Sequence, residues 1–192
     1  MLKAQTCPRC NRITRRGNYC GARCKRESNL SGIIIGAYYE GPLKDAVWHL
    51  KYHHIKGLAE ILGNIVSQNL KQNLPHKRVI LMPVPIHSAR ERERGYNQAE
   101  LLARWLSGKC KLRYMNRGLR KIKNTKTQVE LSGRQRRRNL SGAFLYKGQN
   151  IEGKTIILID DITTTHTTLE ECARVLKLRG ARAVWGFVLA RN

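Results

Sequence analysis

The sequence predicts an α/β fold, a parallel sheet flanked by helices, and three observations carry this prediction. Residues 156–159 form an unbroken Ile-Ile-Leu-Ile run, as in strands that are buried on both faces. Residues 78–84 form a second apolar run, which is closed by Pro83 and Pro85. The last part of the chain reads strand, helix, strand, which implies a right-handed crossover within one sheet. A chain of 192 residues can bury one such core and carry a small appendage.

The first half of this core is predicted to be a strand followed by two helices. Residues 32–39 predict the strand, and Pro42 marks the start of an amphipathic helix. Residues 57–70 predict the second helix, which Pro75 ends. The apolar positions at helical spacing are Leu43, Ala46, Val47 and Leu50 in the first helix and Leu58, Ile61, Leu62 and Ile65 in the second.

The second half adds two more helices and the remaining strands. We interpret the charge-alternating stretch at 90–95 as the approach to a helix that starts near Tyr96. Residues 113–142 show no clean periodicity and predict a long irregular excursion. A further helix ends at Gly180 as its C-cap, and residues 183–189 form the last strand. The apolar positions of these helices are Ala99, Leu102, Ala103 and Leu106, and Leu169, Cys172, Ala173 and Leu176.

The abnormal feature of the composition is its net charge. The chain has 37 Lys and Arg against 13 Asp and Glu, a net charge of +24. Such an excess opposes compaction unless a polyanion relieves it, so nucleic acid is the first partner to consider. The alternative is a solvated basic face without a partner. Glu130 is the one acidic residue between Glu100 and Glu152. The residues that we predict to bind nucleic acid are Arg120, Lys121, Lys123, Arg134, Arg136, Arg137 and Arg138.

Four of the six cysteines form two knuckles near the amino terminus, separated by nine residues: Cys7 and Cys10, then Cys20 and Cys24. This spacing lets four thiolates reach one tetrahedral Zn²⁺. The alternative, a pair of disulfides, is disfavoured in a reducing compartment. A tetrathiolate site is closed to substrate, so the role of the metal is structural. We therefore predict a zinc finger over residues 1–28 and a main domain over residues 29–192.

The hydropathy of the chain predicts no membrane insertion. No apolar run approaches the roughly 20 residues that a transmembrane helix needs. Residues 1–7 lack the apolar core of a secretory signal. We therefore expect a cytoplasmic protein.

Paired carboxylates and a block of hydroxyls follow the 156–159 run. Asp160 and Asp161 fall at the carboxyl end of the predicted strand, where they can accept hydrogen bonds from vicinal ribose hydroxyls or approach a divalent cation. The hydroxyls and N–H groups that come next open a helix, a position that favours phosphate. Their residues are Thr163, Thr164, Thr165, Thr167 and Thr168. A simple turn with an N-cap is the alternative for each feature alone, but the joint pattern favours a phosphosugar site.

This order resembles the phosphoribosyl pyrophosphate (PRPP) motif of the type I phosphoribosyltransferases: a strand, Asp-Asp, two variable residues, Thr-Thr-Gly-x-Thr and a helix. His166 stands where that family usually has glycine, which lets backbone amides approach the 5′-phosphate without a Cβ. A histidine can adopt the left-handed conformation, and its ring is then a candidate phosphate contact. We therefore expect sugar-phosphate binding rather than efficient catalysis.

The same resemblance implies roles for individual residues. Asp160 and Asp161 become the expected catalytic residues, which hold ribose hydroxyls directly or through Mg²⁺, and the turn at 164–168 takes the 5′-phosphate. The backbone that would face the pyrophosphate is that of Val84, Pro85, Ile86 and His87. The candidate clamps are Arg90, Arg92, Arg94 and Lys126. An exposed stretch of alternating charge is the alternative for the three arginines.

Longer motifs extend the resemblance over essentially the whole chain. They are the Arg-Gly-Tyr-Asn-Gln box at 94–98, the segments at 125–132, 136–139 and 142–144, and Leu-Ala-Arg at 189–191. With the cysteine knuckles and the Asp-Asp motif in the same order, the chain is identified as a member of the ComF family. This resemblance implies a cytoplasmic competence protein needed for natural transformation. It implies that the protein handles incoming single-stranded DNA, with other competence or recombination proteins as further partners.

Two functions of different class stay open. The first, which we favour, is a DNA-handling competence factor whose PRPP site is regulatory or only vestigially enzymatic. The second is an active phosphoribosyltransferase that acts on a base or nucleotide. An RNA-associated zinc protein is also compatible with the composition.

Overall fold

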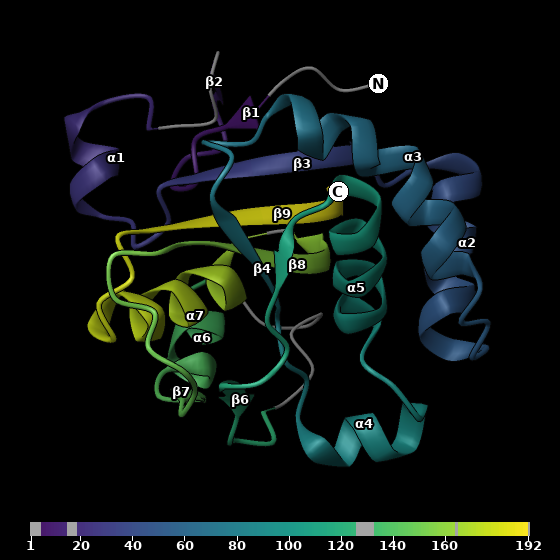
Figure 1. Cartoon of the computed structure of the whole chain (residues 1–192). Helices are drawn as coiled ribbons and strands as arrows, with labels where there is room; N and C mark the ends of the chain where they lie inside the picture. Colours follow the sequence, from purple (N-terminus) through teal and green to yellow (C-terminus); the bar gives the residue numbers. More distant parts are fainter. Residues whose placement is uncertain (1–4, 15–18, 126–132, 164, 192) are drawn as a thin grey trace.

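The computed structural model describes residues 5–14, 19–125, 133–163 and 165–191, apart from the side chains of Gln5, Arg134, Arg136 and Arg137. Within this part, one sheet has the strand order β2-β1-β3-β9-β8-β4-β5 (Figure 1). The strands from β3 to β5 in that order run parallel, whereas β1 and β2 are antiparallel additions beside β3. A separate antiparallel pair consists of β6 and β7. The strands are β1 Gln5–Thr6, β2 Ile13–Thr14, β3 Gly32–Tyr38, β4 Val79–Pro83, β5 Arg113–Tyr114, β6 Leu119–Lys121, β7 Phe144–Tyr146, β8 Thr155–Thr163 and β9 Ala183–Arg191.

Helices cover both faces of the sheet (Figure 1). One face packs against α2, α3 and α5, and the other against α6, α7 and the β6–β7 pair. The α/β prediction with a parallel sheet flanked by helices is therefore confirmed. The helices are α1 Ala22–Arg26, α2 Gly41–Tyr52, α3 Leu58–Gln72, α4 Ser88–Arg94, α5 Gln98–Cys110, α6 Gly133–Leu140 and α7 Thr167–Leu178.

The central strand β8 explains why residues 156–159 are all apolar. Ile156 and Leu158 belong to the core beneath α7, whereas Ile157 and Ile159 belong to the core beneath α3 and α5. All four side chains are fully buried. Because side chains alternate along a strand, a strand with helices on both faces needs an apolar residue at every position.

The buried face of α3 differs from the one that the sequence spacing indicates. Ile61 and Ile65 are 57% and 48% exposed, whereas Val66 and Leu70 are fully buried. The helix lies very close to α5, since a Cβ on Gly63 would come within 2.3 Å of the Trp105 ring. Two neighbouring stripes of α3 are apolar, and the packing against α5 selects the one that contains the glycine.

Two segments are more regular than expected. The stretch at 90–95 belongs to a separate helix, α4, which ends at Gly95 in the left-handed conformation (φ 72°). The next helix, α5, begins at Gln98 after Asn97 as N-cap. The predicted irregular excursion at 113–142 contains β5, β6 and α6. These elements are too short, and α6 too rich in charge, to leave a periodic apolar pattern.

Candidate functional site

The four cysteines of the two knuckles converge on one point. Their sulfur atoms all lie within 4.8 Å of one another, and Cys10 Sγ lies 3.2 Å from Cys20 Sγ. Thiolates bound to zinc at about 2.3 Å sit roughly 3.8 Å apart at the corners of a tetrahedron. The four are free thiols, so a disulfide framework does not hold this segment. The donor set therefore fits a metal ion such as zinc.

The pKa values of the thiols also favour a metal ion at this cluster. Burial opposes ionisation of Cys7, but hydrogen bonds from the backbone N–H groups of Cys10 and Cys20 lower its pKa to about 6. The pKa of Cys24 rises to about 12, chiefly through its hydrogen bond with the Cys20 thiol. Thiols this close cannot all ionise unless a cation offsets their charge, and a bound metal supplies that cation.

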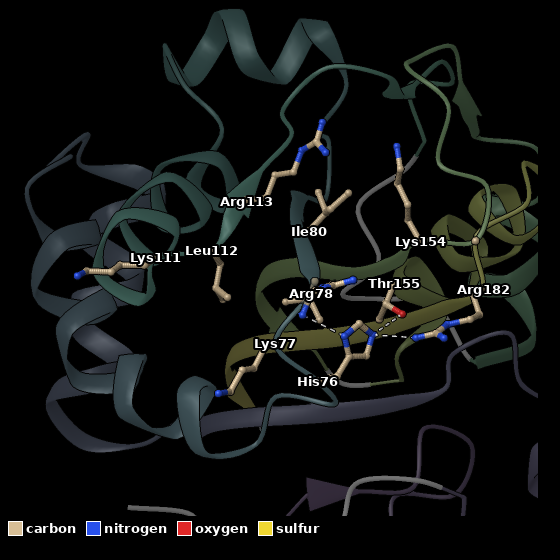
Figure 2. Close-up of a pocket in the computed structure, with 12 residues that line it drawn as sticks. His76, Lys77, Arg78, Ile80, Lys111, Leu112, Arg113, Lys154, Thr155 and Arg182 are labelled. Carbon is tan, nitrogen blue, oxygen red and sulfur yellow. Dashed lines mark hydrogen bonds between the residues drawn. The ribbon is translucent and has the colours of Figure 1, made fainter.

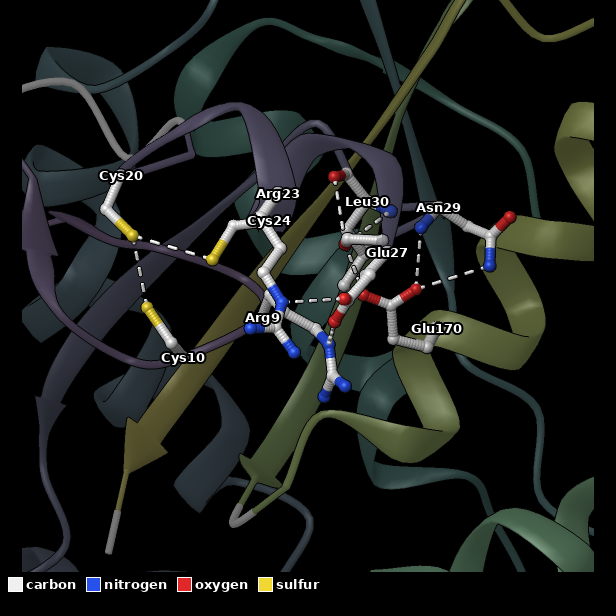
Figure 3. Close-up of polar contacts among 10 residues, drawn as sticks. Arg9, Cys10, Cys20, Arg23, Cys24, Glu27, Asn29, Leu30 and Glu170 are labelled. Carbon is white, nitrogen blue, oxygen red and sulfur yellow. Dashed lines mark hydrogen bonds and ion pairs between the residues drawn. The ribbon is translucent and has the colours of Figure 1, made fainter.

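The knuckle segment is tied to the first turn of α7 (Figure 3). The N–H of Asn29 donates to Glu170 Oε2 at 2.8 Å, and the Ser28 hydroxyl donates to the other carboxylate oxygen. Glu27 pairs with Arg9 of the first knuckle at 3.0 Å. The helix that opens at the predicted phosphate turn is thereby anchored to the cysteine segment.

His166 makes a second connection between these parts. It caps α7 in the left-handed conformation (φ 55°), the conformation that the motif glycine would adopt easily. Its ring is 2% exposed, and Nδ1 lies 3.2 Å from the carbonyl oxygen of Pro8. Burial lowers the pKa of the imidazole to about 4, so the ring is neutral at pH 7 and Nδ1–H donates to Pro8. The ring, a candidate phosphate contact in the sequence, faces the knuckle instead.

The paired carboxylates lie within β8, which continues beyond the end of β4. Asp161 Oδ2 lies 3.0 Å from Nζ of Lys51 on α2. Burial raises the pKa of Asp160 to about 8, and repulsion from Asp161 adds to the shift, whereas Lys51 opposes it. An acid with a pKa near neutrality can hold or release a proton at physiological pH, a property common in functional sites.

The loop after β4 runs beside these carboxylates. The N–H of Val84 donates to the carbonyl of Ile159 at 2.9 Å, the residue before Asp160. Pro85 and Ile86 are half-buried, and the side chain of His87 caps α4. The predicted pyrophosphate loop and the Asp-Asp pair are therefore neighbours at the same edge of the sheet.

Lys121 lies near Asp160, and Arg90 lies near Lys121. Burial lowers the pKa of Lys121, the Arg90 guanidinium lowers it further, and Asp160 raises it. Arg90 also donates to the carbonyl of Thr125 at 3.2 Å, and His87 forms a backbone bridge with Lys121. Residues predicted for nucleic acid (Lys121) and for pyrophosphate (Arg90 and His87) thus meet at one place.

The other predicted clamps lie elsewhere. Arg94 places its guanidinium over the Tyr52 ring, 5.4 Å from the centroid, and Arg92 is exposed to solvent. Lys126 lies outside the described residues. Of the three arginines of α4, Arg90 is the one whose charge acts on Lys121.

The Arg-Gly-Tyr-Asn-Gln box holds this region in place. Asn97 donates from Nδ2 to the carbonyl of Val84 at 3.0 Å, and its Oδ1 accepts from the N–H of Ala99 at 3.0 Å. The Tyr96 hydroxyl donates to the carbonyl of Leu50 on α2. Sequence reasoning missed these roles, although an asparagine directly before an apolar periodic stretch is an N-cap signal.

The threonines of the turn have distinct environments. Thr163 is nearly buried, and its hydroxyl accepts from the N–H of His166 at 3.2 Å. The hydroxyls of Thr165 and Thr167 lie 2.9 Å apart and line a cavity of about 330 Å³, whose wall includes Pro8. The described hydroxyls therefore leave room for a ligand on the side of the cysteine segment. Thr164 lies outside the described residues, and Thr168 belongs to the first turn of α7.

The basic surface predicted for nucleic acid is described in part. Arg120, Lys123 and Arg138 are exposed, and Lys123 Nζ donates to the carbonyl of Ser141 at 2.8 Å. The side chains of Arg134, Arg136 and Arg137 lie outside the described part of the chain, although α6 itself is described.

No protein-family model matches the chain. The chain is 31% identical over 180 residues to competence protein F of Haemophilus influenzae. The aligned region covers 90% of this chain and 79% of that protein. The chain belongs to the ComF family. This ComF-family chain is also 28% identical over 194 residues to DNA utilization protein YhgH of Escherichia coli (97% and 84% covered). It is 35% identical over 159 residues to competence protein ComFC of Bacillus subtilis (80% and 62% covered). The resemblance stated from the motifs is confirmed.

Solved structures give weaker likenesses. A hypoxanthine phosphoribosyltransferase of Staphylococcus aureus overlaps this ComF-family chain with a TM-score of 0.40 and 14% identity, over 68% of this chain and 61% of that one. A phosphoribosylpyrophosphate synthetase of Mycobacterium smegmatis overlaps it with a TM-score of 0.34 and 18% identity, over 68% and 33%. These values carry no conclusion on ligand or activity. None of the helices in the described ranges has the length and hydropathy that a membrane span requires.

Proposed function

We propose that this ComF-family protein handles incoming single-stranded DNA in the cytoplasm during natural transformation and holds PRPP, with Mg²⁺, at the Asp160 end of β8. Relatives named for competence and for DNA utilization support the first part. The net charge of +24 supports a polyanionic partner. The neighbouring carboxylates, cations and turn hydroxyls support the second part.

The observation that carries the proposal is the position of Lys121. This residue belongs to the basic β6 strand, next to exposed Arg120, and its charge interacts with Asp160 and Arg90. Exposed Arg138 and Arg120, together with Lys121, support a basic surface that reaches the Asp-Asp pair. A sugar pyrophosphate and a DNA strand would occupy adjoining parts of that surface, so the binding of one would influence the other.

Each part of the PRPP site would have its own task. Asp160 and Asp161 would accept hydrogen bonds from the ribose hydroxyls, and the turn before α7 would take the 5′-phosphate. The loop at 84–87 and the Arg90 guanidinium would face the pyrophosphate. A bound Mg²⁺ would offset the charge of the pyrophosphate oxygens. Lys51 already pairs with Asp161, so Asp160 is the carboxyl group better placed to bind a ligand.

The cysteine segment would serve this site indirectly. We propose a structural Zn²⁺ at the four thiols and a boundary near residue 28 between the finger and the main domain. The metal would hold in place the Pro8 carbonyl and the backbone of Asn29, which contact His166 and Glu170.

Calorimetry with Mg-PRPP tests the sugar-phosphate site. We expect saturable binding by the wild type, loss of binding by the Asp160→Asn, Asp161→Asn double variant, and unchanged binding by Asp45→Asn, which alters an exposed carboxylate of α2. Equal binding by the wild type and the double variant would show that PRPP does not bind at Asp160 and Asp161. No binding by the folded wild type would remove PRPP from the proposal.

Fluorescence anisotropy with a labelled single-stranded oligonucleotide tests the DNA part. Affinity should fall steeply with salt, and the Arg120→Gln, Arg138→Gln variant should reduce the slope of log Kd against log salt by about 1.4, since each lost phosphate contact removes roughly 0.7. A wild type that does not bind single-stranded DNA at about 0.1 M salt would contradict DNA handling.

An active phosphoribosyltransferase is the second candidate, and one observation favours it. Burial and the Asp161 charge raise the pKa of Asp160 to about 8, which suits proton transfer near neutral pH. This function predicts pyrophosphate release from PRPP with Mg²⁺ and one acceptor base or nucleotide. Binding of Mg-PRPP without release by any acceptor in a panel of bases and nucleotides would leave a regulatory site.

A further inference from the structure

A second cavity lies at the amino-terminal ends of the parallel strands, whereas the Asp-Asp pair lies toward their carboxyl ends. Figure 2 shows the residues that line this cavity. Its volume is about 570 Å³, and its walls are residues that precede or begin the parallel strands β4, β5, β8 and β9. From Thr155, in its wall, to Asp160 the strand β8 rises by about 16 Å. The cavity is therefore separate from the proposed PRPP site, which lies beyond the carboxyl ends of the strands.

The walls of this cavity are strongly cationic. They contain six basic side chains, which come from four separate segments: Lys77, Arg78, Lys111, Arg113, Lys154 and Arg182. All of the lining residues are described, and none of them is an aspartate or glutamate. Figure 2 shows that Lys77 and Lys111 point away from Thr155 and Arg182. The other like charges gathered at one concave space repel one another and concentrate positive potential there, so an anion that enters relieves the repulsion.

His76, in the wall of the cavity, faces more donors than it can accept from. His76 Nδ1 lies 3.1 Å from the N–H of Arg78, and Nε2 lies 2.8 Å from Thr155 Oγ1 and 3.1 Å from the Arg182 guanidinium. A neutral imidazole has one acceptor nitrogen. In one tautomer, Nδ1 accepts from the Arg78 N–H, Nε2 carries the proton, and the Arg182 guanidinium faces another donor. In the other tautomer, Nε2 accepts from Arg182, Nδ1 carries the proton, and the Arg78 N–H faces another donor. One of these two donors therefore lacks an acceptor in His76, and an anionic oxygen would supply it.

We propose that this cavity binds the phosphodiester backbone of single-stranded DNA, a second DNA contact that rests on the proposed DNA-handling function. Cations on separate segments exceed what one phosphate group needs, whereas successive phosphates of a strand can meet these segments in turn. The lining contains no Phe, Tyr or Trp, so it offers no platform for base stacking. The contact is therefore electrostatic and independent of base sequence.

Anisotropy titrations of matched variants test this site. The Arg78→Gln, Arg182→Gln variant removes two cavity charges, and Lys44→Gln, Lys56→Gln removes two exposed charges outside the cavity. The cavity variant should bind a labelled oligonucleotide about 10- to 30-fold more weakly at about 0.1 M salt, with a salt slope reduced by about 1.4. The control should stay within about twofold of the wild type, and thermal melting should show that both variants fold.

The outcomes separate this inference from the proposed function. A wild type that binds no DNA would remove both. A wild type that binds DNA, with a cavity variant that binds as well as the control, would overturn the cavity alone. Deoxythymidine monophosphate in excess, at matched phosphate and ionic strength, should displace the strand poorly. Displacement equal to that by an unlabelled strand would show that the cavity takes a free phosphate and would overturn the backbone assignment.

Discussion

His166 Nδ1 lies 3.2 Å from the carbonyl oxygen of Pro8, so one hydrogen bond joins the start of α7 to the first cysteine knuckle. The two residues are separated by 158 positions in the sequence. The contact is buried, and it holds the residue that replaces the glycine of the PRPP motif. The proposed metal site and the proposed sugar-phosphate turn therefore share one support.

This relationship predicts the effect of changing His166. His166→Ala should lower the free energy of unfolding by about 1–3 kcal/mol, because it leaves the buried Pro8 carbonyl without a donor. His166→Asn keeps a donor and tolerates the left-handed conformation, so its loss should be smaller. Urea denaturation measures both. Equal losses would mean that the hydrogen bond to Pro8 does not stabilise the fold.

Metal removal should loosen the start of α7. We expect about one zinc per chain in the purified wild type by elemental analysis, and less in Cys20→Ser. Hydrogen exchange of residues 165–170 should speed up in that variant, since the Pro8 and Asn29 contacts depend on the knuckle. Cys110→Ser, outside the cluster, is the control and should keep both the metal and the protection. Unchanged hydrogen exchange after metal loss would show that the start of α7 does not depend on the metal site.

The half-buried Asp160 predicts a pH dependence. Its folded pKa of about 8 exceeds the unfolded value of about 3.9, so the folded state holds the proton between these values. Its contribution to stability is therefore fully present below about pH 4 and is lost as pH rises to about 8, by on the order of a few kcal/mol.

Asp160→Asn, which cannot ionise, should remove that slope. Denaturation midpoints measured from pH 4 to pH 9 without Mg²⁺ should fall less steeply for the variant than for the wild type. Asp45→Asn, at an exposed position, should keep the wild-type slope. A variant as pH-dependent as the wild type would show that Asp160 titrates normally.

Asn97 has two bonds that can be removed separately. Asn97→Ala loses the N-cap of α5 and the donor to Val84, and it should cost about 2–4 kcal/mol of stability. Asn97→Ser keeps a capping oxygen but is too short to reach Val84, so its cost should be intermediate. Chemical denaturation gives the stabilities, and calorimetry with Mg-PRPP reports on the loop. A serine variant as stable as the wild type would mean that the Val84 bond contributes nothing.

Parts of the candidate site were predictable because they are local. The apolar run at 156–159 and the Asp-Asp pair stand next to each other in the sequence, and a strand end is a local event. The knuckle spacing is local too. The interpretation of α3 was wrong at Ile61 and Ile65, because the choice between two apolar stripes depends on α5.

Contacts between distant polar residues had no such signal. Lys51 with Asp161, Lys121 with Asp160 and the cations of the second cavity come from segments that share no periodic pattern. A charged residue that pairs across the fold looks, in the sequence, like any solvated lysine or arginine.

The sequence by itself determined the α/β class, the cysteine cluster, the basic character and the family of this protein, since these follow from short-range order, composition and motifs. The tertiary structure alone decided that the ring of His166 faces the knuckle and that burial beside Asp161 raises the pKa of Asp160. It also decided that basic residues gather at the amino-terminal edge of the sheet. The reason is physical: burial, dielectric environment and the distance between charges are properties of the packed chain, and folding brings those groups together from remote positions.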